Sequence, residues 1–167
     1  ADRRYAAPAD VVVSPKNDMS RRETHMTLWY WEQVGGALIE EFMVLPRQEG
    51  QGRRLLDGLI VLGEPKKKLP AGSRFNIESR DVIVVQTKNS RLGMYLMGQT
   101  LFSAQLIKRF FRPHSIQAVA LCAKNDLVLQ PMLEAYEGCR VVVCPPEVSG
   151  LTTGCSGSPK KPAPAEP

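Results

Sequence analysis

Residues 82–88 read Val-Ile-Val-Val-Gln-Thr-Lys, an apolar run that ends in an amide and an ammonium group. Side chains alternate between the two faces of a strand, so Gln86 and Lys88 should share one face while Thr87 lies on the other. Apolar residues on both faces indicate a strand buried in the middle of a sheet. The stretch therefore predicts a central strand that presents two polar groups, two residues apart, near its end.

Residues 54–62, Arg-Leu-Leu-Asp-Gly-Leu-Ile-Val-Leu, predict a second buried strand. Asp57 interrupts this apolar run, and a charge in a buried strand is costly unless it is paired or binds a metal. If the two strands pair as a hairpin, we expect Asp57 to meet Gln86 and Lys88 at one edge of the sheet. The alternatives for Asp57 are a position in a turn or an ion pair with Arg54 or Lys88.

The remaining elements predict an α/β fold, with a mixed central β-sheet flanked by helices and the order α-β-β-β-α-β-α-β. The first three strands would form an antiparallel meander, and the later strand–helix–strand unit implies a parallel pair. A long polar connection, 63–80, joins the two strands described above. Helices are predicted at 17–34, 92–111 and 127–136, and strands at 37–45, 54–62, 82–88, 116–123 and 140–144.

The chain has 167 residues, which fits one domain over 18–148 with a flexible N-terminal arm (1–17) and a disordered tail rich in Pro, Gly and Lys (149–167). Its formal charge of +5 is compatible with a polyanionic partner. No apolar run is long enough to cross a membrane, so no membrane partner is expected. The four cysteines form no C-x-x-C pair, which favours reduced structural thiols and a cytoplasmic or other intracellular location.

The segments around Asp57 and Gln86-x-Lys88 resemble the bipartite motif of the PD-(D/E)XK, or restriction-endonuclease-like, nuclease superfamily, in its Gln-x-Lys variant. The core of that superfamily, α-β-β-β-α-β, matches the element order predicted here. Many members carry a Glu on the first helix, and Glu23, on the first predicted helix before Gly35, is similar in placement. The resemblance covers roughly residues 20–145.

The resemblance implies an enzyme that hydrolyses phosphodiester bonds in DNA with Mg²⁺, for which Mn²⁺ can substitute, and it favours an endonuclease over an exonuclease. Lys88 would activate a water molecule or stabilise the transition state, and Gln99 on the following helix would position substrate or water. The groups implied as metal ligands are Asp57, Glu23, Gln86 and the backbone carbonyl of Thr87.

DNA is the implied partner, together with a second copy of the chain or a separate specificity or targeting subunit. Basic side chains would contact phosphates without reading bases; the candidates are Lys66, Lys67, Lys68, Arg53 and Arg54. Gln86 departs from the pattern, because most members have Glu or Asp there and an amide brings no negative charge. One alternative is therefore a catalytically inactive nuclease-fold module that binds nucleic acid or a protein. Another is an unrelated α/β protein with the motif by chance.

Each side chain also has a structural interpretation. Glu23 could only close a capping box with Ser20 at the start of its helix. Lys88 could be the solvated end of a strand. Gln99 could belong to an ordinary polar helix stripe with Tyr95 and Ser103, which are spaced at i, i+4. Either Glu40 or Glu41 could replace Glu23 near the site, although solvent-facing charges are the simpler interpretation of both.

Overall fold

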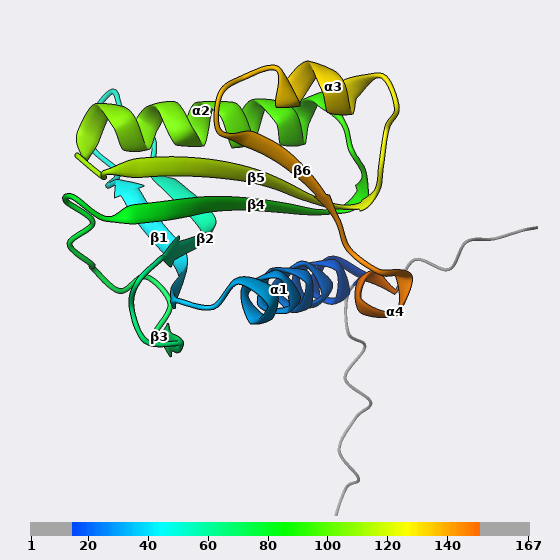
Figure 1. Cartoon of the computed structure of the whole chain (residues 1–167), viewed down its shortest axis with the longest axis horizontal. Coiled ribbons are helices and arrows are strands. Elements are labelled where there is room, and N and C mark those ends of the chain that lie inside the picture. The colour runs from blue at the N-terminus through cyan, green and yellow to red at the C-terminus, as the bar shows by residue number, and fades with distance from the viewer. Residues whose placement is uncertain (1–14, 151–167) are drawn as a thin grey trace, which may run out of the picture.

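The computed structural model describes residues 15–150, with side chains described from Ser20 onward. It is an α/β structure in which a six-stranded mixed sheet lies between two helical layers, with α1 and α4 on one face and α2 and α3 on the other (Figure 1). The helices are α1 (Pro15–Val34), α2 (Met94–Phe110), α3 (Leu129–Glu134) and α4 (Pro146–Ser149). The strands are β1 (Ala37–Leu45), β2 (Arg54–Val61), β3 (Lys67–Leu69), β4 (Asp81–Arg91), β5 (Ser115–Lys124) and β6 (Cys139–Val143).

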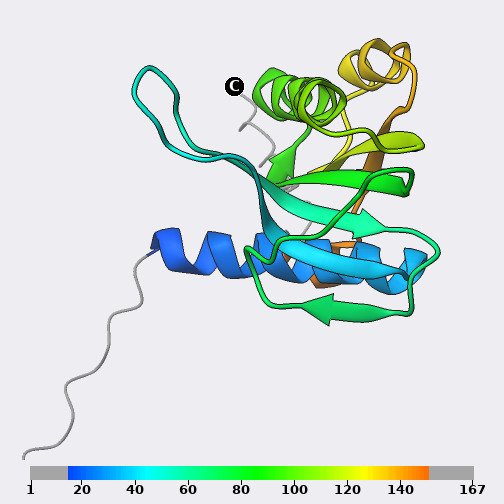
Figure 2. The same ribbon diagram turned by 90° about the vertical axis from the view of Figure 1, so that its left-hand side faces the viewer.

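The strands lie in the order β3-β1-β2-β4-β5-β6. Strands β1, β2 and β4 form an antiparallel meander, whereas β4, β5 and β6 are parallel to one another. Both relations confirm the arrangement expected from the sequence. The turn between β1 and β2 extends as a long hairpin away from the sheet, beyond the helices on either face (Figure 2).

Strand β4 is central because both of its faces are buried in apolar cores. Ile83 and Val85 pack under α1, in a core that also holds Met26 and Trp31. Val82 and Val84 pack under α2, in the larger core, with alternate residues of β2 and β5. Burial of apolar surface on both faces stabilises this strand whatever its local propensity, which explains its continuous apolar sequence.

Two elements of the structure were not predicted. Strand β3 lies within the connection 63–80 and pairs in parallel with the start of β1 at the sheet edge. Its sequence, Lys-Lys-Leu, has no strand periodicity, so the pairing itself creates the strand. Helix α4 is a single turn beginning at Pro146, and it packs against α1.

The remaining boundaries differ from the predictions by a few residues. Strand β4 extends to Arg91, and α1 begins at Pro15 rather than residue 17. The predicted arm and tail otherwise lie outside the described residues. No helix between residues 15 and 150 is both long enough and apolar enough to span a membrane.

The turn between α1 and β1 makes a specific demand on Gly36. Gly35 and Gly36 both have φ near the left-handed region, at 79° and 78°. A Cβ on Gly35 would meet nothing within 4 Å, but one on Gly36 would lie 2.5 Å from the Val61 carbonyl oxygen. The first glycine is therefore required by conformation alone, and the second by conformation and by the close approach of β2.

These two glycines form a matched pair for a stability measurement. We expect Gly35→Ala to lower the free energy of unfolding by about 1 kcal/mol, the cost of the left-handed conformation. Gly36→Ala should lower it by about 2 kcal/mol, because the backbone of β2 must also move. Urea denaturation of both variants checks this, and equal losses would show that the contact with Val61 carries no cost.

Candidate functional site

Strands β2 and β4 separate at one end of the sheet. There, two carboxylates accept the backbone hydrogen bonds of β4 that β2 no longer accepts. The paired register of these strands ends at Gly58 and Val85. Beyond it, the Asp57 Oδ2 atom accepts a hydrogen bond from the Thr87 backbone N–H at 2.8 Å, and Glu23 Oε1 accepts one from the Asn89 N–H at 3.2 Å. Asp57 and Glu23 therefore accept hydrogen bonds from the N–H groups of Thr87 and Asn89, which are two residues apart on β4.

A change of face along β1 and β2 directs Asp57 toward α1. Strict alternation would place Asp57 with Leu59, which lies in the core under α2. However, Leu56 also lies in that core, and Asp57 and Gly58 instead face α1 together. The neighbouring strand changes in the same place, at Glu41, whose φ of 52° is left-handed. Two consecutive residues of β2 therefore face α1.

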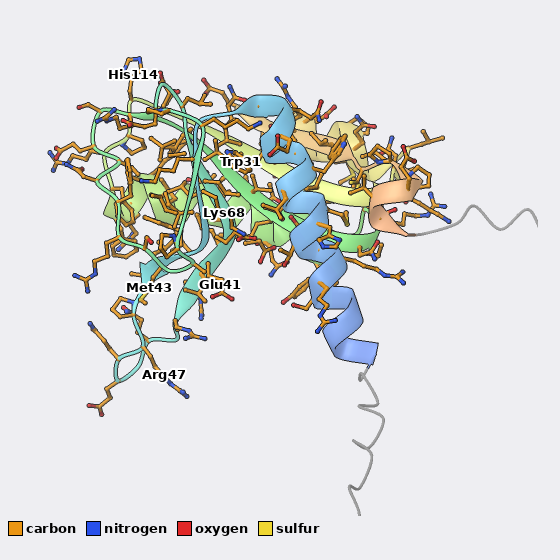
Figure 3. The ribbon with its side chains drawn as sticks, turned by 90° about the horizontal axis from the view of Figure 1, so that it is seen from below. Trp31, Glu41, Met43, Arg47, Lys68 and His114 are labelled. Carbon is orange, nitrogen blue, oxygen red and sulfur yellow. The ribbon has the colours of Figure 1, made fainter. Side chains whose placement is uncertain are left out.

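The side chains at this point line a hollow of about 280 Å³ between α1 and the root of the hairpin. Figure 3 shows Glu41 at this root, above the part of the hairpin that carries Arg47. Among the nine lining residues, four carry carboxylates and none is a cation. We call this the acidic hollow; its residues are Ser20, Glu23, Thr24, Thr27, Glu40, Glu41, Asp57, Ala71 and Thr87.

The electrostatics of the acidic hollow disfavour the ionised form of Asp57. Its side chain keeps an exposed surface, but the protein atoms packed around the carboxylate desolvate it, and this burial raises its pKa above the ordinary value. The Thr87 N–H lowers the pKa, Glu23 raises it, Lys88 lowers it and Glu41 raises it. The net direction is upward, chiefly through desolvation, and a bound cation would stabilise the ionised carboxylate against both desolvation and the negative charges of Glu23 and Glu41.

Lys88 reaches the acidic hollow from the end of β4. Its Nζ atom lies 3.1 Å from Glu23 Oε1, and its side chain is 41% exposed. The structure therefore brings Asp57, Glu23 and Lys88 together, as expected. It also excludes the capping-box interpretation of Glu23, because α1 begins eight residues earlier, at Pro15, and the carboxylate contacts β4.

Gln86 and Gln99 do not join this group, and the prediction that Gln86 converges with Asp57 is wrong. Gln86 is 3% exposed on the opposite face of the sheet, where its Nε2 donates to Ser103 Oγ of α2 at 2.8 Å. Side chains up to Gln86 alternate regularly along β4, and this places Gln86 on the α2 face. The alternation along β2 is broken, so Asp57 lies on the α1 face instead. Gln86 and Gln99 instead line a separate hollow of about 490 Å³ beside α2.

The predicted phosphate contacts fall into two groups. Lys66 pairs with Glu32, and Lys68 pairs with Glu40 of the acidic hollow. Lys67 makes no ion pair within the described part of the chain. Arg53 and Arg54 lie away from these lysines and line the hollow that contains Gln86 and Gln99.

Sequence reasoning missed Thr27 and Asn89 on the α1 face, and it predicted the Thr87 carbonyl as a metal ligand but not the contact of the Thr87 hydroxyl group. The Thr27 and Thr87 hydroxyl groups share a hydrogen bond of 2.8 Å that joins α1 to β4 beside Asp57. Asn89 is buried, and its Oδ1 is the one buried side-chain polar atom without a partner among the described residues. Alternation from Val85 predicts that Thr87 and Asn89 share this face, and that pattern was the available signal.

The acidic hollow offers donors that suit Mg²⁺, although no group of three or more His, Cys, Asp or Glu side chains in residues 15–150 is arranged to hold a metal. Asp57 Oδ1 and Glu23 Oε2 make no hydrogen bond within the described part of the chain, since the contacts there use the other oxygens. A strand residue presents its N–H and C=O to the same neighbour, so the Thr87 carbonyl lies on the Asp57 side. Mg²⁺ commonly takes one or two carboxylates and completes its shell with water and phosphate.

Comparison of the chain with protein-family models, with curated protein sequences and with solved structures finds no match. The functional interpretation therefore rests on the residues and contacts described above.

Proposed function

We propose that this protein is a Mg²⁺-dependent nuclease that hydrolyses phosphodiester bonds in DNA. The observation that carries the proposal is the meeting of Asp57, Glu23 and Lys88 where β2 and β4 separate. The element order supports it, because a helix, an antiparallel three-strand meander, a second helix and a parallel strand are the core expected of the restriction-endonuclease-like superfamily.

In this proposal the carboxylates of Asp57 and Glu23 hold the ion, with the Thr87 carbonyl as a third donor. Bound there, Mg²⁺ supplies a Lewis acid that lowers the pKa of water and offsets charge on the phosphate. The Thr87 N–H fixes the Asp57 carboxylate, and the Asn89 N–H fixes that of Glu23. Lys88 holds a positive charge beside Glu23 and stabilises the negative charge that develops in the transition state.

A second candidate is a module of the same fold that binds nucleic acid or protein without cutting. The observation that favours it is the position of Gln86, which faces α2, so that Asp57 and Glu23 lack the further side-chain ligand that the resemblance implies. This candidate predicts DNA binding that does not depend on metal.

The deciding experiment compares DNA cleavage by the wild type and by Lys88→Ala. Supercoiled, linear and single-stranded DNA are incubated with Mg²⁺ or Mn²⁺, and EDTA is the blank. We expect cleavage by the wild type and a loss of about 100-fold in Lys88→Ala, the scale seen when one electrostatic stabiliser of a transition state is removed.

Lys108→Ala is the matched control, because Lys108 is an exposed lysine of α2 that lies outside the acidic hollow and makes no ion pair in the described part of the chain. It should cut at the wild-type rate. A wild type that is inert on every DNA form in both metals, yet folded by circular dichroism, would reject the nuclease and favour the binding module.

A further inference from the structure

The hollow beside α2 has the opposite electrostatic character to the acidic hollow. Its lining includes no carboxylate, and neither Arg53 nor Arg54 makes an ion pair within the described part of the chain. We call it the arginine–aromatic hollow; its lining residues are Arg53, Arg54, Leu55, Leu56, Gln86, Tyr95, Gly98, Gln99, Phe102, Ser103 and Leu106. Two unpaired guanidinium groups at one concave site attract an anionic partner.

Two aromatic rings border this hollow and are largely open to solvent. Tyr95 is 74% exposed and Phe102 is 67% exposed. They are seven residues apart on α2, which places them on one helix face about 10 Å apart along the axis. Exposed rings at this spacing leave their faces available for stacking.

The floor of the arginine–aromatic hollow is polar. Gln86, which is 3% exposed at the base of the hollow, donates its Nε2 to Ser103, and its Oε1 makes no hydrogen bond in the described residues. This oxygen can therefore accept a hydrogen bond from a bound molecule. Arginines, exposed rings and amide groups in one hollow are the combination that binds unpaired nucleotides.

We infer that the arginine–aromatic hollow binds single-stranded DNA, with bases on Tyr95 and Phe102 and phosphates at Arg53 and Arg54. The inference rests on the proposed function, since it names the form of the substrate. Bases inside a duplex are stacked on each other and cannot stack on these rings, so single strands are favoured. Arg54 and Asp57 are three residues apart on β2, about 10 Å, and the hollow and the proposed metal site lie on opposite faces of the sheet at this end of the strand.

The test measures binding without metal, so that it does not depend on cleavage. A fluorescent oligo-dT strand and a duplex of equal length are titrated in EDTA with the wild type and the double variant Tyr95→Ala, Phe102→Ala. We expect the wild type to prefer the single strand and the double variant to bind it about 100-fold more weakly, about tenfold for each ring lost.

The matched control is the double variant Phe110→Ala, Tyr136→Ala, which removes two exposed rings outside the hollow. It should bind like the wild type. A third variant, Arg53→Ala with Arg54→Ala, should reduce the salt dependence of binding by about 0.7 for each phosphate contact that is lost.

Unchanged affinity in the Tyr95 and Phe102 variant, a preference for duplex, or no binding by the wild type would each overturn the inference. If that variant loses self-association in sedimentation but binds DNA normally, the rings belong to a protein interface and the inference fails. A wild type that binds single strands through these rings but never cuts would reject the nuclease alone. Normal binding by the Tyr95→Ala, Phe102→Ala variant, together with intact cleavage by the wild type, would reject the inference about the arginine–aromatic hollow and leave the proposed nuclease activity in place.

Discussion

The Asp57→Asn variant is expected to lose cleavage by about 1000-fold while becoming more stable than the wild type in the absence of metal. The loss follows because a metal ion contributes several kcal/mol to the stabilisation of transition-state charge, and each 1.4 kcal/mol changes the rate tenfold. The Asn oxygen can still accept the hydrogen bond from the Thr87 N–H, so the local fold should persist.

The gain in stability follows from the direction of the Asp57 pKa. Burial raises this pKa in the folded protein, so the folded state binds the proton more tightly than the unfolded state does. The free energy of unfolding therefore falls as the pH rises from the unfolded pKa through the folded one, and the penalty is complete once the pH is above the folded pKa. Asn carries no charge to desolvate, and the variant should lose this pH dependence together with the penalty.

Thermal unfolding with and without Mg²⁺ measures both effects. Metal at about 100 times its Kd would stabilise the wild type by about 2.7 kcal/mol, a rise of about 5 °C in Tm or more. Asp57→Asn should start from a higher Tm in EDTA and gain nothing from Mg²⁺. Asp81→Asn, at the other end of β4, is the control and should keep the rise with metal. A metal-dependent rise in Asp57→Asn equal to that of the wild type would exclude Asp57 as a ligand.

The sheet could be predicted largely from sequence, because the pattern of apolar residues within each central strand is enough to indicate that strand. Strands β2 and β4 are apolar on both faces, and this marks them as central whatever their neighbours are. Strand β3 could not be found in this way, since its two lysines carry no periodic signal and it exists through pairing with β1. Patterns that follow from burial are visible in a sequence, whereas an edge strand made by a partner is not.

The candidate site shows the limit of the alternation argument. Asp57, Glu23 and Lys88 were expected together and lie together. Gln86 was expected with them because strict alternation gives it the same face as Asp57. The left-handed φ of Glu41 and the consecutive inward positions of Asp57 and Gly58 break that alternation in β1 and β2. Glu is an uncommon residue in this conformation, so nothing in the sequence marks the change.

This difference leads to the second large effect, which is that Gln86→Glu should destabilise the fold rather than improve cleavage. The motif alone suggests that a carboxylate here would restore a metal ligand. In the structure the side chain is buried under α2 and bonded to Ser103, away from the acidic hollow. A carboxylate there must be desolvated, and we expect a loss of about 3 kcal/mol in the free energy of unfolding at neutral pH.

The loss should depend on pH in a definite direction. Burial raises the pKa of a carboxyl group at position 86 in the folded state, so the Gln86→Glu variant should lose stability as the pH rises above the ordinary Glu range, near 4.3. Urea denaturation at pH 4 and pH 8 measures this, with Gln105→Glu on the exposed face of α2 as the control that should change little. Cleavage that rises tenfold in Gln86→Glu without a loss of stability would instead place residue 86 at the metal. That outcome would show that the wild type lacks a ligand, because the added carboxylate could raise the rate only from within the acidic hollow.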